Sequence, residues 1–171
     1  RSLPDVNISP IIDGGGHESG LRSGTLNVPA IVGFGEALKL SLSKMSKEEK
    51  RIRELRDSLE NQILKQIPDS KLNGSKENRL AGNINVYLPK VRSEGLMNAL
   101  REDIAISSGS ACTTIEVEPS HVLQSLGMKD DMIHSSIRIG IGRFNTKEEI
   151  DYAGKRLIEE YHRLLDFISA L

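Results

Sequence analysis

Apolar and polar residues alternate over three short segments of this chain, which is the pattern of half-buried β-strands. The segments are 83–88, 104–107 and 136–141. In the last of them three isoleucines share one face, and Ser136, Arg138 and Gly140 share the other. Strands with one apolar face are usual in antiparallel or mixed sheets that helices cover on that face. The pattern therefore predicts a small sheet with one buried face.

Apolar residues at three- and four-residue spacing predict helices around these strands. The expected helices span 29–42, 46–67, 93–102 and 118–127, with a last one opening at Thr146. Ser46 with Glu49, and Thr146 with Glu149, match the capping-box spacing that marks a helix start. Residues 71–79 are polar and are expected to form a loop. Together the elements predict an α+β fold: a small antiparallel or mixed sheet with helices on one face.

Composition limits the classes of function. The chain has 171 residues, of which 37% are hydrophobic and 27% charged, as in one ordinary soluble domain. A net charge of −1 and the absence of Trp give no support for a nucleic-acid surface. No apolar run reaches the length of a membrane span, and no signal-peptide pattern stands at the start of the chain. One cysteine excludes an internal disulfide and fits a reducing cytosol, so the expected location is cytoplasmic.

Three features could carry chemistry, and each also has a purely structural interpretation. Five glycines between residues 14 and 24 could turn backbone N–H groups toward an anion, with the hydroxyl of Thr25 as a further donor, or could form a wide turn. Arg138 could grip a carboxylate beside Gly140, or could be a solvated arginine on an open sheet face. Cys112 lies among small residues and could be a reactive thiol, or a buried cysteine that packs like a small apolar residue.

No metal site is expected. The four histidines lack metal-ligand spacing, and Cys112 with His121 and His134 has no feature that fixes a coordination geometry. A Cys–His hydrolase pair is equally unsupported, because no third residue that would orient the histidine stands in a readable motif.

Three blocks of sequence, in this order, resemble the C-terminal part of NifS/IscS-type cysteine desulfurases. The blocks are GGGHESGLRSGTLN at 14–27, SSGSACT at 107–113 followed by EPS at 118–120, and SSIRIGIGRF at 135–144. The resemblance covers essentially the whole chain. It implies the fold of aspartate-aminotransferase-like enzymes, which use pyridoxal phosphate. The resemblance also implies two regions. Residues 1–28 would form a lead-in strand and the cofactor-phosphate loop, at a cut edge of a larger domain. Residues 29–171 would form the C-terminal small domain, with a mobile cysteine loop at about 107–118.

The resemblance also implies roles for single residues. Cys112 matches the nucleophile that takes sulfur from L-cysteine, leaving L-alanine and a persulfide for iron–sulfur cluster or thio-cofactor assembly. Arg138 matches the residue that holds the substrate carboxylate. Gly24 and Thr25 match the loop that reaches the cofactor phosphate of the neighbouring subunit in a homodimer. A sulfur-acceptor or iron–sulfur scaffold protein would be the partner, and no role with nucleic acid or membranes is implied.

One residue of the family pattern is absent. The lysine that binds the cofactor belongs shortly before the triple glycine, in an N-terminal half that carries most cofactor contacts, but no lysine precedes Gly14 here and the chain opens with Arg1. The expectation is therefore a C-terminal portion of the enzyme that is inactive without its N-terminal pyridoxal-phosphate-binding half. A non-enzymatic module that carries a persulfide on Cys112 or mediates dimerisation is the alternative. Apolar surface around Val6–Ile12 and the first helix predicts self-association.

Overall fold

The computed structural model describes residues 8–108 and 119–170, and the chain divides into two compact units. The first unit ends at Lys44 and the second begins at Met45. Residues 8–27 form turns and bends, and helix α1 (Val28–Gln66) starts after them and ends within the second unit. The second unit contains the sheet and the hydrophobic core.

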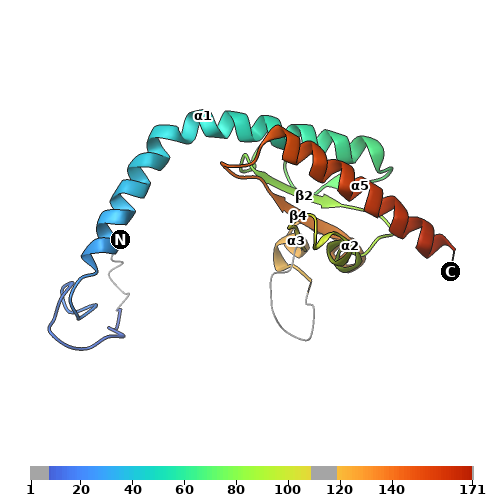
Figure 1. Ribbon diagram of the computed structural model, residues 1–171. Helices are drawn as coiled ribbons and strands as arrows, with labels where there is room; N and C mark the ends of the chain where they lie inside the picture. Colours follow the sequence, from blue (N-terminus) through green and yellow to red (C-terminus); the bar gives the residue numbers. More distant parts are fainter. Residues whose placement is uncertain (1–7, 109–118, 171) are drawn as a thin grey trace. The chain divides into compact units, whose positions relative to one another are not determined.

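A four-stranded antiparallel sheet forms the centre of the second unit (Figure 1). Its strands are β1 (Lys71–Leu72), β2 (Asn83–Tyr87), β3 (Ser107–Ser108) and β4 (Ser136–Gly140), in the spatial order β1-β2-β4-β3. The two longer strands alternate as the sequence predicts, because the isoleucines and valine of β2 and β4 are buried on one face. The α+β fold with a small antiparallel sheet is confirmed.

Helices cover the apolar face of this sheet. Figure 1 shows α5 (Lys147–Ser169) and the C-terminal part of α1 on the same side of the strands. These helices and α2 (Ser93–Leu100) supply most of the other core residues: Leu55, Leu59, Ile63, Leu96, Leu100, Ile150, Leu157, Ile158 and Tyr161. Two short helices, α3 (His121–Ser125) and α4 (Asp130–His134), precede β4.

The last helix begins and packs as its sequence predicts. The N–H of Glu149 donates to the Thr146 hydroxyl at 3.2 Å, and the N–H of Thr146 donates to the Glu149 carboxylate at 3.1 Å, so the capping box is formed. Gly154 then allows close contact with α1, because a Cβ there would lie 2.9 Å from the Leu59 Cδ1. The absence of a side chain brings the two helices together over the core.

The helix boundaries in the first half of the chain differ from the expectation. Residues 29–42 and 46–67 belong to one helix, α1, and not to two. Nothing between residues 43 and 45 ends a helix, since the sequence there is Ser-Lys-Met without Pro or Gly. Ser46 is therefore an interior residue of α1, and its capping-box spacing with Glu49 does not mark a helix start.

Smaller differences concern the sheet edges. The strand expected at 104–107 is β3 at Ser107–Ser108, although Ile104 and Ile106 still pack against the core. The structure adds β1 within the expected loop 71–79, and it adds α4. The helix expected from residue 118 is α3, which begins at His121. Two-residue strands and one-turn helices are too short to show a period in the sequence.

The first unit exposes a series of large apolar side chains. Ile11, Val32 and Phe34 are 93%, 65% and 71% exposed. Val28, Ile31, Leu38, Leu40 and Leu42 are also exposed. Among the described residues, no helix is both long and apolar enough to cross a membrane.

Candidate functional site

A row of three polar residues crosses the sheet on the face opposite the isoleucines. Arg138 of β4 lies directly between Asn85 of β2 and Ser107 of β3 in the strand register. Directly opposed residues of antiparallel strands point to the same face, so these three side chains are neighbours. Arg138 is exposed, whereas Ile137 and Ile139 on either side of it are buried. The alternation of β4 thus turns the guanidinium away from the core.

The guanidinium of Arg138 is held at one nitrogen. Its Nε donates to the hydroxyl of Ser107 at 3.2 Å. Neither terminal nitrogen has a hydrogen-bond partner within residues 8–108 and 119–170. A Cβ placed on Gly140, two residues along the same face, would meet nothing within 4 Å. A guanidinium that is bonded only through Nε keeps a pair of terminal N–H groups, and such a pair can bind a carboxylate through two parallel hydrogen bonds.

On the other side of Arg138, polar side chains form a hydrogen-bond network of their own. The side-chain amide of Asn73 donates to Asn85 Oδ1 at 2.8 Å and to the Ser136 hydroxyl at 3.0 Å. The Ser136 hydroxyl in turn donates to the carbonyl of Met132 at 2.7 Å. This network links the residue after β1 to β2 and β4 beside Arg138.

The glycine-rich loop of the first unit has its own internal structure. Ser23 is buried, and its hydroxyl accepts from the N–H of Gly16 at 3.2 Å. Arg22 donates through Nη1 to the carbonyls of Gly24 at 3.0 Å and of Thr25 at 3.2 Å. Gly24 has a φ of 101°, a conformation that favours glycine.

Some donors of this loop are not used by the loop itself. The N–H and hydroxyl of Thr25 and the N–H of Gly24 have no hydrogen-bond partner within the described part of the chain. The positive charge of Arg22 lies on the same turn. Free donors beside a cation are what a phosphate requires. Gly24 and Thr25 therefore offer donors beside a cation, and their expected role at the cofactor phosphate stays a prediction.

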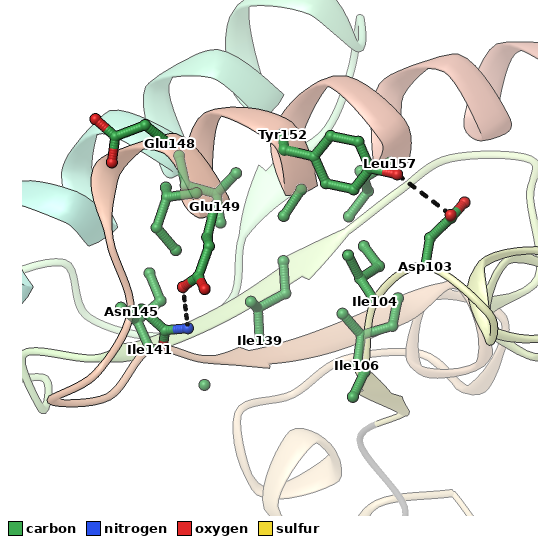
Figure 2. Close-up of a pocket in the computed structure, with 15 residues that line it drawn as sticks. Asp103, Ile104, Ile106, Ile139, Ile141, Asn145, Glu148, Glu149, Tyr152 and Leu157 are labelled. Carbon is green, nitrogen blue, oxygen red and sulfur yellow. Dashed lines mark hydrogen bonds between the residues drawn. The ribbon is translucent and has the colours of Figure 1, made fainter.

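A cavity of about 580 Å³ lies on the opposite face of the sheet from Arg138, between the strands and α5 (Figure 2). Its wall is mostly aliphatic, with Ile104, Ile106, Ile139 and Ile141 on the sheet side. At the rim Tyr152 donates to Asp103, as Figure 2 shows. A mostly aliphatic wall offers few groups that could bind a charged ligand, so the polar row, and not the cavity, is the candidate binding site.

Charges at the cavity rim serve the fold. Arg156 donates to Asp103 at 2.7 Å and lies 3.0 Å from Glu159. The hydrogen bond from Arg156 lowers the pKa of the Asp103 carboxyl, and the same bond raises the pKa of the Arg156 guanidinium. These ions link the segment before β3 to α5.

The remaining candidate residues are placed only in part. Cys112 lies outside the described residues, so its expected role stays a prediction. His121 and His134 lie on α3 and α4, and no group of three or more His, Cys, Asp or Glu suited to a metal occurs in the described ranges. The first unit holds Gly24 and Thr25, and the second holds Arg138.

The family model for class-V aminotransferases, described as "Aminotransferase class-V", matches residues 13–153. This chain belongs to that family. Cysteine desulfurase IscS of Ehrlichia chaffeensis is 48% identical over 164 residues, which are 96% of this chain and 40% of that protein. Cysteine desulfurase IscS of Haemophilus influenzae is 53% identical over 152 residues, 89% of this chain and 37% of that protein.

A solved structure agrees with this assignment. The NifS-like protein from Rickettsia africae superposes with a TM-score of 0.78 at 32% identity, over 92% of this chain and 41% of that one. The chain therefore spans about 40% of the length of the curated relatives that it matches. Class-V aminotransferases depend on pyridoxal phosphate.

Sequence reasoning missed two residues of the candidate site. Ser107 was expected only as the end of a strand, because nothing in the sequence shows that β3 pairs with β4 beside Arg138. Arg22 lies within the glycine-rich block, and a positive charge next to Thr25 in a loop suspected of anion binding was an available signal.

Proposed function

We propose that this chain supplies the substrate-binding and sulfur-accepting part of a pyridoxal-phosphate-dependent cysteine desulfurase. The observation that carries the proposal is the Arg138 guanidinium on the polar face of the sheet, which is held at Nε while neither terminal nitrogen has a partner among the described residues. The likeness to curated cysteine desulfurases supports it. Residues 1–28 then form the lead-in and phosphate loop, and residues 29–171 form the small domain.

Arg138 binds the carboxylate of L-cysteine through its two terminal nitrogens and fixes the direction in which the substrate side chain points. Gly24 and Thr25 hold the cofactor phosphate, in the neighbouring subunit of a homodimer. When it is bound, pyridoxal phosphate supplies the electron withdrawal that weakens bonds at the substrate carbons. In this proposal the covalent anchor of the cofactor belongs to the part of the curated relatives' length that this chain does not span.

Cys112 is the nucleophile. Its thiolate attacks the sulfur of L-cysteine, so that an S–S bond forms while the substrate C–S bond breaks. The carbon takes a proton in place of sulfur, which leaves L-alanine, and Cys112 carries the sulfur as a persulfide. No external oxidant is needed, because the carbon is reduced as the sulfur is oxidised. A sulfur-acceptor or iron–sulfur scaffold protein of the cytoplasm then receives the sulfur.

The test compares the chain alone with the chain supplemented by the N-terminal, cofactor-binding part of a curated relative. Alanine is measured after addition of pyridoxal phosphate and L-cysteine, and the persulfide on Cys112 is measured by mass spectrometry. We expect both products only in the supplemented sample. Cys112→Ser should abolish the persulfide, and Arg138→Lys should raise the KM for L-cysteine, because an ammonium cannot form the two parallel bonds.

Two results would contradict the proposal. Alanine formation by the chain alone, together with a stoichiometric borohydride-reducible adduct on one of its lysines, would overturn the need for a second part. A supplemented sample that binds pyridoxal phosphate and forms no alanine would overturn the desulfurase assignment. Sulfur transfer to Cys112 from a persulfide donor in that sample would then indicate a sulfur-carrying module.

A further inference from the structure

The hydroxyl of Ser107 makes two contacts with one residue. It accepts a hydrogen bond from Nε of Arg138 at 3.2 Å and lies 3.4 Å from the carbonyl oxygen of Arg138, to which it donates. Ser107 occupies β3 directly opposite Arg138 in the strand register. One side chain on a neighbouring strand thus bridges the backbone and the guanidinium of the arginine.

The contact with Ser107 determines which N–H groups of the Arg138 guanidinium remain available to a ligand. A guanidinium has five N–H groups in a planar fork, and the Nε–H points along one edge of it. Since Ser107 takes the Nε–H, the two terminal nitrogens remain for a ligand, and they carry the parallel pair of N–H groups on the outer edge that matches a carboxylate.

No other group in the described ranges accepts a hydrogen bond from this guanidinium. Asn85, on the opposite side of Arg138, has its amide oxygen occupied by Asn73 at 2.8 Å. Arg138 makes no ion pair with any described carboxylate. Without the Ser107 contact, an exposed arginine would sample many rotamers. Ligand binding would then have to restrict the side chain to one of them, at a cost in conformational entropy.

We propose that Ser107 is a positioning residue for carboxylate recognition: its hydroxyl presets the Arg138 side chain so that both terminal nitrogens meet the substrate together. The proposal rests on the proposed function for the identity of that carboxylate, which is the one of L-cysteine. Ser107 touches neither substrate nor cofactor and acts through Arg138 alone.

The kinetic test uses the supplemented enzyme with Ser107→Ala, Ser107→Thr and a control. Ser107→Ala should raise the KM for L-cysteine about three- to tenfold, because the arginine must be ordered at the expense of binding, and should leave kcat within about twofold. Ser107→Thr keeps the hydroxyl and should restore the KM. Ser169→Ala is the matched control, because its hydroxyl donates to the Leu165 carbonyl at 2.8 Å on α5, away from the site.

A second test uses the chain alone and needs no activity. In ¹⁵N NMR spectra at mildly acidic pH, the Nε–H signal of Arg138, assigned through its loss in Arg138→Lys, should exchange with water at least about threefold faster in Ser107→Ala. Ser107→Thr and Ser169→Ala should keep the original rate. Hydrogen-bonded N–H groups exchange slowly, so the rate reports the Ser107 contact directly.

The two tests separate the possible failures. Equal Nε–H exchange in the unsubstituted chain and in Ser107→Ala overturns the positioning role, whatever the enzyme does. An inactive supplemented enzyme with the expected exchange difference contradicts the proposed function and leaves the contact established. An unchanged KM in an active Ser107→Ala enzyme overturns the role in substrate binding, and a fall in kcat without a change in KM does the same.

Discussion

Gly82 allows the two long strands to meet at their ends, and its replacement by alanine should weaken the fold strongly. A Cβ on Gly82 would lie 2.0 Å from the carbonyl oxygen of Ile141 and 3.0 Å from the Ile52 Cγ2. Real Cβ atoms essentially never come closer than 3.0 Å, so the backbone at Gly82 or Ile141 must move by about 1.0 Å. No side-chain rotation can relieve a contact with a backbone atom.

The cost of Gly82→Ala follows from what that movement disrupts. The N–H of Ile141 donates to the carbonyl of Gly82 at 2.8 Å, and moving the chains apart weakens this bond, worth about 1 kcal/mol. Overpacking adds about 1–3 kcal/mol. The free energy of unfolding should therefore fall by about 2–4 kcal/mol. With the usual dependence of this free energy on urea concentration, the urea midpoint falls by about 1–3 M.

Gly95→Ala is the matched control for this measurement. A Cβ on Gly95 meets nothing within 4 Å, and Gly95 lies in α2, where alanine stabilises a helix by about 0.5–1 kcal/mol relative to glycine. In urea unfolding followed by circular dichroism, the midpoint of Gly82→Ala should lie below that of the unsubstituted chain, and the midpoint of Gly95→Ala should lie above it. A loss below about 1 kcal/mol in Gly82→Ala would refute the close backbone approach.

Three further predictions concern the last helix, the cavity rim and the first unit. Thr146→Ala removes the capping hydroxyl and should lower the free energy of unfolding by about 1 kcal/mol in the same urea assay, and an unchanged value would contradict the cap. The hydrogen bond from Arg156 lowers the pKa of the Asp103 carboxyl from 3.8, so its contribution to stability is present at neutral pH and is lost as the pH falls through the lowered pKa. An NMR titration should place the Asp103 midpoint below 3.8, and Arg156→Ala should bring it back; equal midpoints would refute the link. The exposed apolar residues of the first unit should cause self-association, which sedimentation velocity would show as larger species at higher concentration, and a monomer at all concentrations would contradict this.

Local patterns predicted those parts of the fold that depend on local rules. The alternation at 136–141 gives the direction of Arg138, because successive side chains of a strand point to opposite faces. The capping box at Thr146 and Glu149 marks the start of α5 for a similar reason, since both bonds join residues three apart. The same spacing at Ser46 misled, because a capping box needs a chain that enters from outside the helix, and α1 is continuous there.

Contacts between distant segments could not be predicted in this way. β4 pairs with β2 and with β3, and nothing in the sequence of either neighbour names its partner. The two-residue strands β1 and β3 are defined only by these pairings. The expected strand at 104–107 therefore began too early, and Ser107 was not recognised as a neighbour of Arg138. Cys112 lies outside the described residues, so its role as the nucleophile stays a prediction.

The position of Arg138 depends on its strand being held on both sides. β4 is an inner strand, so its backbone is bonded to β2 on one side and to β3 on the other. The isoleucines adjacent to Arg138 are buried under α1 and α5, and the Gly82 carbonyl holds the next segment at Ile141. A side chain on such a strand has little freedom except in its own rotamers, and Ser107 restricts those. The core and the polar face therefore both position Arg138. Packing in the core fixes the backbone of β4, and the hydroxyl of Ser107 orients the guanidinium.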